Sequence, residues 1–137
     1  MKKILFLTLI FISLIGCEKE SSLDEVEQSQ KVEVVVEDIK QVKVSGEVNL
    51  VVDKAKDIEI IGKAINQSTR IAGILDVAPS NLTLELMNND GKTDVVWLWL
   101  PQDEGDGMMM FETDTHTGYK LRNEDKVALL VLIFGLE

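Results

Sequence analysis

The sequence contains a single cysteine, a single histidine and two prolines among its 137 residues, and it has few cations. One cysteine cannot form an intrachain disulfide, so the fold must be stabilised by core packing. Lysine and arginine together number 14 against 24 acidic residues, which gives a formal net charge of −10. This excess of negative charge argues against nucleic acid as a partner and against direct adhesion to anionic lipid, because both require basic surface.

The one cysteine, Cys17, directly follows a segment with the layout of a secretory signal. Lys2 and Lys3 form a positive start, residues 4–15 are apolar apart from one threonine and one serine, and Gly16 is small. The apolar run is too short to span a membrane, which takes about 20 residues. An ordinary signal peptide with an incidental cysteine is the alternative interpretation.

The four residues Leu14-Ile15-Gly16-Cys17 resemble the lipobox of bacterial lipoproteins. The resemblance implies cleavage between Gly16 and Cys17 and a diacylglyceryl group on the Cys17 sulfur. Two acyl chains supply the two signals that stable membrane attachment needs. We therefore expect residues 1–16 to be a lipoprotein signal peptide, and the protein to be lipid-anchored on the extracytoplasmic face of the cell membrane.

The stretch from Cys17 to Gln30 is polar, acidic and free of aromatic residues. Such a composition cannot bury enough apolar surface to order itself. We expect residues 17–30 to be the lipidated cysteine and a flexible acidic tether, with ends on the order of 20 Å apart for a random coil. Residues 31–137 are then expected to form a single globular domain.

Apolar spacing divides the expected domain into short elements. The predicted strands, besides a central hairpin, are Lys31–Glu37, Val42–Val44, Glu47–Val52, Arg70–Val77, and a second hairpin of Met108–Thr113 and Gly118–Leu121 with Asp114–Thr117 as its loop.

Two helices are predicted among these strands. An amphipathic helix is expected over Lys54–Gln67 with Asp53 as its N-cap. A second, buried helix is expected over Val127–Phe134 with Asn123 as its N-cap, although its β-branched content leaves a strand as the alternative. The sum is an α+β fold, a mainly antiparallel sheet of five to seven strands with two helices packed on one face.

Residues 82–100 hold the clearest pattern, two apolar strands around Asp90-Gly91. That pair suits a two-residue type I′ turn. With a two-residue loop, Leu84 pairs with Trp97 and Leu82 with Trp99, so both tryptophans are predicted to face the core with the leucines. A loop that differs by one residue inverts this assignment, because side chains alternate between the two faces of a sheet.

The order of these features is similar to that of small Bacillus-type lipoproteins with a YhfM-like domain. The resemblance covers residues 47–134 and is carried by turn and core residues, namely Asp90-Gly91, Trp97-Leu98-Trp99 and Gly118-Tyr119-Lys120-Leu121. It implies the fold and the location, and it transfers no catalytic or binding residue.

Three features are candidates for chemistry. His116 is expected to be an exposed loop histidine, because no second cysteine and no G-x-S-x-G serine accompanies it. Met108–Met110 are expected to fill core rather than to bind a soft metal. An acidic stretch could offer oxygens to calcium, but its spacing does not match an EF-hand, so a solvated loop is expected. The stretch is Pro101–Gly107 with Glu112 and Asp114 beyond it, and the candidate ligands in it are Asp103, Asp106, Glu112 and Asp114.

No catalytic residue, metal or cofactor is therefore expected. The leading hypothesis is a non-enzymatic binding or interaction module, held at the membrane through the Cys17 lipid and able to contact a protein partner in the cell envelope. The alternative is an inhibitor or immunity-type lipoprotein that blocks a secreted enzyme or toxin. An enzyme comes third, because the sequence pairs no nucleophile with a base.

Overall fold

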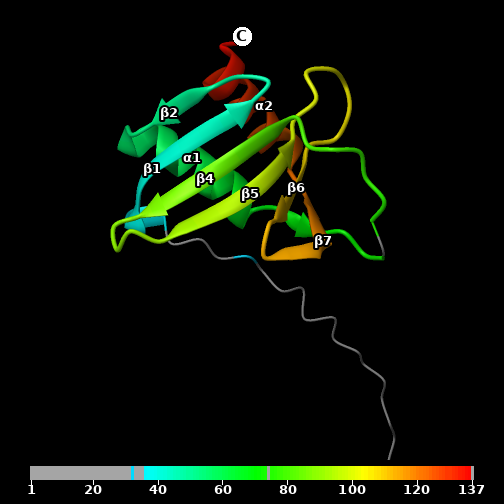
Figure 1. The fold of residues 1–137 in the computed structure, drawn as a ribbon. Helices are drawn as coiled ribbons and strands as arrows, with labels where there is room; N and C mark the ends of the chain where they lie inside the picture. The colour runs from blue at the N-terminus through cyan, green and yellow to red at the C-terminus, as the bar shows by residue number, and fades with distance from the viewer. Residues whose placement is uncertain (1–31, 33–35, 74, 137) are drawn as a thin grey trace, which may run out of the picture.

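The computed structural model describes residues 32, 36–73 and 75–136. The predicted signal peptide, Cys17 and the tether lie outside the described residues. Seven antiparallel strands form one sheet in the order β2-β1-β4-β5-β6-β7-β3 (Figure 1). The strands are β1 (Ile39–Gly46), β2 (Leu50–Val52), β3 (Thr69–Arg70), β4 (Leu82–Asn88), β5 (Thr93–Trp99), β6 (Met108–Phe111) and β7 (Asp114–Lys120).

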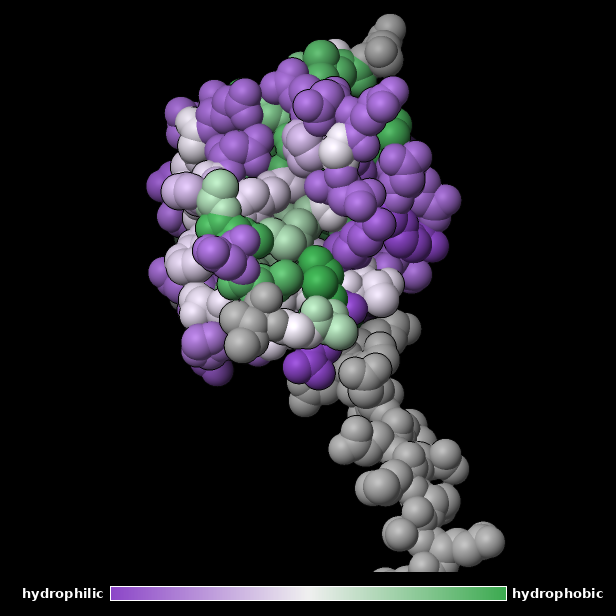
Figure 2. Space-filling view, turned by 90° about the vertical axis from the view of Figure 1, so that its right-hand side faces the viewer, coloured by the Kyte–Doolittle hydropathy of each residue, from purple (hydrophilic) through white to green (hydrophobic). Residues whose placement is uncertain are grey.

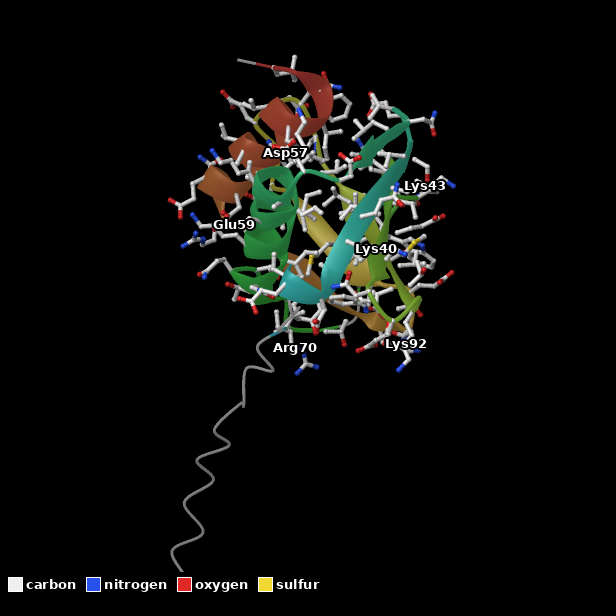
Figure 3. All side chains as sticks on the ribbon, turned by 90° about the vertical axis from the view of Figure 1, so that its left-hand side faces the viewer. Lys40, Lys43, Asp57, Glu59, Arg70 and Lys92 are labelled. Carbon is white, nitrogen blue, oxygen red and sulfur yellow. The ribbon has the colours of Figure 1, made fainter. Side chains whose placement is uncertain are left out.

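Two helices, α1 (Ala55–Asn66) and α2 (Asn123–Phe134), cover one face of this sheet, here called the inner face (Figures 1 and 3). The predicted α+β class is confirmed. Lys54 and Arg122 hold the N-cap positions in place of the predicted Asp53 and Asn123, and neither makes a side-chain cap hydrogen bond. Within the described part of the chain, neither helix combines the length and apolar character needed to cross a membrane.

The core lies between the inner face and the two helices. Every second residue of the central strands is fully buried there, as the pattern of Leu82, Leu84 and Leu86 shows. α1 contributes its amphipathic stripe of Ile58, Ile61 and Ile65, each 4% exposed or less. This burial of aliphatic side chains is the main stabilising contribution in a chain without a disulfide.

The register of the β4–β5 hairpin differs from the prediction. Leu84 pairs with Val96, and Trp97 lies opposite Thr83. The loop has three residues rather than two, because the Asn88 amide donates to the Lys92 carbonyl at 2.8 Å and Gly91 takes a φ of 85°. Both tryptophans therefore lie on the outer face, and the prediction that they face the core is wrong.

The C-terminal end of the first predicted strand, Lys31–Glu37, is also corrected. Val36–Asp38 forms a single 3-10 turn, η1, and the strand β1 begins only at Ile39. Val36 sits so close to Gly62 of α1 that any Cβ at Gly62 would overlap it. This contact packs η1 against α1.

Two further strand boundaries are wrong. The predicted strand Arg70–Val77 pairs with β7 only at Thr69 and Arg70, after which the chain leaves the edge of the sheet. The predicted loop Asp114–Thr117 belongs to β7 instead, and the turn precedes it. Met110 pairs with Gly118 and Phe111 with Asp114, so the three residues between Asp114 and Gly118 form a bulge.

α2 departs from its predicted full burial. Leu129 and Ile133 are 2% and 5% exposed, whereas Val127 and Val131 are 50% and 46% exposed. The helix lies at the surface of the inner layer, and one side of it meets the core and α1. Apolar residues on every side of a helix therefore do not by themselves show that the helix is fully buried.

Candidate functional site: a groove on the outer face of the sheet

The outer face of the sheet carries both tryptophans. Because burial alternates along β5, Val96 and Leu98 point to the core while Trp97 and Trp99 are half-buried on the opposite side. Their neighbours across the register are Thr83 on β4 and Met108 and Met110 on β6. An outer face rich in large apolar side chains calls for a covering segment or for a ligand.

The segment between β3 and β4 (described residues 71–73 and 75–81), here called the covering segment, covers part of this face. The Ile71 amide donates to the Gly118 carbonyl at 2.8 Å, and the chain then crosses above β7. A Cβ at Gly118 would overlap the Leu75 side chain, so this glycine allows the close approach. Met110 is 3% exposed beneath this covering layer.

A second contact fixes the covering segment at Trp99. The Trp99 indole Nε1 donates to the Ala78 carbonyl oxygen at 2.7 Å. At the end of the segment, Asn81 is held by both backbone groups of Leu100, since its Oδ1 accepts from the Leu100 amide at 2.8 Å and its Nδ2 donates to the carbonyl. These bonds hold the segment above β5 without closing it onto Trp97.

A groove of roughly 420 Å³ remains between the covering segment and the sheet. The groove is lined by Leu75, Asp76, Val77, Ala78, Pro79, Ser80, Trp97, Trp99, Met110 and Thr115. Figure 2 views this side of the molecule and shows apolar residues gathered around a shallow hollow, with polar residues at its margins. This volume falls within the range of small-ligand sites, about 300–1,000 Å³.

The polar groups of the groove are few. Of the lining residues that the structure describes, Asp76 alone has an ionisable side chain, while Ser80 and Thr115 supply hydroxyls. The Trp97 indole N–H has no acceptor among the described residues, and Trp97 is half-buried. Such a mixture suits binding of an apolar group with a few directed polar contacts.

The groove could not be found from the predicted register, which placed its two tryptophans in the core. Residues 95–100 are all apolar, so the side chains on both faces of β5 are apolar and the sequence does not show which face is buried. The one usable signal was the run Asn88–Lys92, which is long enough for a three-residue loop with Gly91 in the left-handed region.

His116 lies in the bulge of β7, and its side chain is exposed, as predicted. The Asp114 Oδ1 accepts from the backbone amide of His116 at 3.2 Å, not from its imidazole. A hydrogen bond from the Thr117 side chain, followed by that backbone bond, lowers the pKa of Asp114. The carboxylate therefore shapes the bulge and does not orient the histidine as a base.

The acidic loop before β6 is closed by a lysine. Lys126 of α2 is only 5% exposed, and its Nζ donates to the carbonyl oxygens of Asp103, at 2.5 Å, and of Gly105. Asp106 is bound instead to Lys120 at 2.8 Å. Among the described residues, no group of three or more histidine, cysteine or acidic side chains is placed to hold a metal ion. The loop's inward carbonyls thus face an ammonium group of the chain itself.

We expect Lys126→Met to lower the free energy of unfolding by about 1–3 kcal/mol, because two carbonyls lose a charged donor. Lys120→Met is the matched control, since its ion pair with Asp106 is exposed and contributes less than about 1 kcal/mol. Urea unfolding measures both variants. Equal losses in the two variants would contradict a special role for Lys126.

The three methionines of β6 divide between the two faces. Met109 is 1% exposed in the core, Met110 lies under the covering segment, and Met108 is half-buried beside Trp99. Met109 thus fills core as predicted, whereas Met110 contributes to the groove.

Comparison with known proteins places this fold in a family. The family model described as "YhfM protein" matches residues 26–134, most of the chain. The chain belongs to the YhfM family. The match covers all ten groove-lining residues and both helices, and it extends further toward the N-terminus than the predicted resemblance over residues 47–134.

A solved structure also resembles this YhfM-family fold. It is a thioesterase-like protein from Clostridium sporogenes ATCC 15579, with 11% sequence identity and a TM-score of 0.53, covering 77% of this chain and 100% of its own. At this identity the likeness concerns the fold alone. No curated protein matches the chain.

Proposed function

We propose that this YhfM-family protein is a lipoprotein of the extracytoplasmic membrane face, and that its domain is a non-enzymatic module that binds a ligand or partner in the outer-face groove. The observation that carries the binding role is the pair of tryptophans beside an open groove of ligand size. Half-buried tryptophans beside an unfilled hollow give a ligand large apolar contacts at low entropic cost.

A binding role also fits the position of the ionisable groups. The only ionisable side chain in the groove is Asp76, and His116 interacts through its backbone with Asp114. Catalysis by general acid and base needs a positioned pair within hydrogen-bond reach of the substrate. The thioesterase-like title belongs to a protein with 11% identity, and we propose no such activity for this chain.

The anchor is proposed from the sequence alone. The lipobox-like Leu14-Ile15-Gly16-Cys17 and the preceding apolar run support lipidation of Cys17, which would hold the domain at the membrane surface. Location at the membrane and binding by the groove are separate parts of the proposal, and separate experiments test them.

Cys17→Ala is expected to abolish lipidation, because no other thiol exists in the chain to carry the lipid. The variant should remain as an uncleaved precursor or appear in the soluble fraction. Membrane fractionation followed by intact-mass measurement checks this outcome. A Cys17→Ala protein that is still cleaved after Gly16 and still membrane-bound would refute the anchor.

Binding is tested on detergent-solubilised, tagged full-length protein. Species that copurify with the wild type should be lost with Trp97→Ser, which removes the half-buried indole from the groove. Val131→Ser is the matched control, because it removes a 46%-exposed apolar side chain from α2 behind the sheet. Loss of the copurifying species with both variants, or with neither, would contradict binding through the groove. Circular dichroism verifies that both variants fold.

A further inference from the structure

The charged side chain that lines the groove is negative. Among the described residues that line it, Asp76 is the only charged one, and none is a lysine, arginine or histidine. No described residue forms an ion pair with Asp76. The chain as a whole carries a net charge of −10, which raises the local concentration of cations.

The tryptophans favour the same sign of ligand charge. The faces of an indole ring are electronegative, and tryptophan is the strongest aromatic partner for a cation within about 6 Å of the ring centre. Trp97 and Trp99 both line the groove, and neither is fully buried. No described cationic side chain lies among the lining residues to satisfy these rings.

The remaining walls are apolar. Leu75, Val77, Ala78, Pro79 and Met110 supply aliphatic and thioether surface around the two indoles. A strongly hydrated inorganic ion gains little from such walls, whereas an alkylated cation keeps its charge and buries its carbon atoms. The volume of roughly 420 Å³ has room for a cationic group together with a larger apolar part of the same ligand.

We propose that the groove binds an organic cation with an apolar body, of the alkylammonium or quaternary ammonium class. The cationic centre lies against the Trp97 and Trp99 rings, Asp76 supplies the counter-charge, and the covering segment contacts the carbon skeleton. The inference rests on the proposed binding function of the groove and names the chemistry of what it binds.

The probes are choline and its uncharged carbon isostere, 3,3-dimethyl-1-butanol. These molecules share shape and hydroxyl group, and they differ in the positive charge. Titration calorimetry and indole fluorescence of the folded full-length protein should show choline binding at least threefold more tightly than the isostere. Raising the salt concentration should weaken choline alone, since exposed charges are screened.

Variants assign the charge preference to the named residues. Trp97→Leu keeps apolar contact but removes the ring, and should weaken choline binding by about 2–5-fold, the size of an exposed cation–π contact. Asp76→Asn should weaken choline by a similar factor and leave the isostere unchanged. Glu59→Gln is the matched control, because it removes one exposed carboxylate from α1, on the other side of the sheet (Figure 3).

Two results would overturn this inference. Equal affinity for choline and the isostere would mean that the groove recognises apolar shape only, and the binding function would stand without the charge preference. A lack of measurable binding of choline would also reject the cation class, while the copurification test with Trp97→Ser judges the binding function separately. An equal loss in Glu59→Gln and Asp76→Asn would reject the role of Asp76.

Discussion

Leu98→Ala is expected to lower the free energy of unfolding by about 2–5 kcal/mol, which is the usual cost of removing a fully buried leucine. Leu98 is 1% exposed, points to the inner face and pairs with Leu82 of β4. The variant leaves a cavity beneath the helices that the surrounding sheet cannot close. Urea unfolding followed by circular dichroism gives the difference in the free energy of unfolding between the wild type and Leu98→Ala.

Trp97→Ala is the comparison that makes this prediction specific. The indole is larger than the leucine side chain, but it is half-buried on the outer face, beside an open groove. Its removal should therefore cost less than Leu98→Ala, since the lost contact area is smaller and no closed cavity forms. A larger loss for Trp97→Ala than for Leu98→Ala would mean that the observed hairpin register is wrong.

Gly46→Ala is expected to destabilise the domain by at least about 2 kcal/mol. Gly46 ends β1 with a φ of 122°, a conformation that side-chain-bearing residues adopt at a cost of about 1–3 kcal/mol. An added Cβ would also overlap the backbone carbonyl oxygen of Asn81, which accepts the Glu47 amide at 3.0 Å. Backbone atoms cannot move aside as a flexible side chain can, so the β1–β4 pairing must shift.

Gly135→Ala separates the two contributions. Gly135 has a φ of 67° at the C-cap of α2, and an added Cβ would meet nothing within 4 Å. This variant carries conformational strain without the overlap, so thermal unfolding should show a clearly smaller loss than for Gly46→Ala. Equal losses would mean that strain alone accounts for the effect at Gly46.

The sequence predicted the parts of the fold that local signals determine. The helix over residues 54–67 was found because its apolar residues follow helical spacing, and α1 indeed spans Ala55–Asn66. The α+β class followed from the mixture of strand-like and helix-like segments. The YhfM resemblance was also correct, and the residues that carried it, Asp90-Gly91, Trp97-Leu98-Trp99 and Gly118-Tyr119-Lys120-Leu121, lie within the matched range.

The hairpin register was not determined by those signals. The alternation of Val95, Trp97 and Trp99 against Val96 and Leu98 offers two apolar faces, so burial could not choose between them. The observed register is accompanied by a long-range contact, since the amide of Asn89, in the three-residue loop, donates to the Asp38 carbonyl at 2.7 Å. Asp38 is 51 positions away, and no local pattern in the hairpin reports it.

The candidate site was missed for the same reason and for one more. The sequence predicts a strand for the covering segment because Ile71, Leu75 and Val77 are apolar, but only Thr69 and Arg70 pair with β7. The later residues are apolar because they contact the outer face near Gly118 and line the groove. An edge strand and a segment that packs across the face of a sheet have the same apolar composition. Only tertiary contacts distinguish the two.

Trp97 lines an open groove on the outer face of the sheet, so its indole is accessible to solvent. Iodide quenching of tryptophan fluorescence in the Trp99→Phe variant tests it directly, because Trp97 is then the only tryptophan left. Iodide is expected to quench the emission of the folded protein, and saturating choline is expected to protect the indole from iodide. A blue-shifted emission that iodide does not quench would place Trp97 in the core and contradict its position on the outer face.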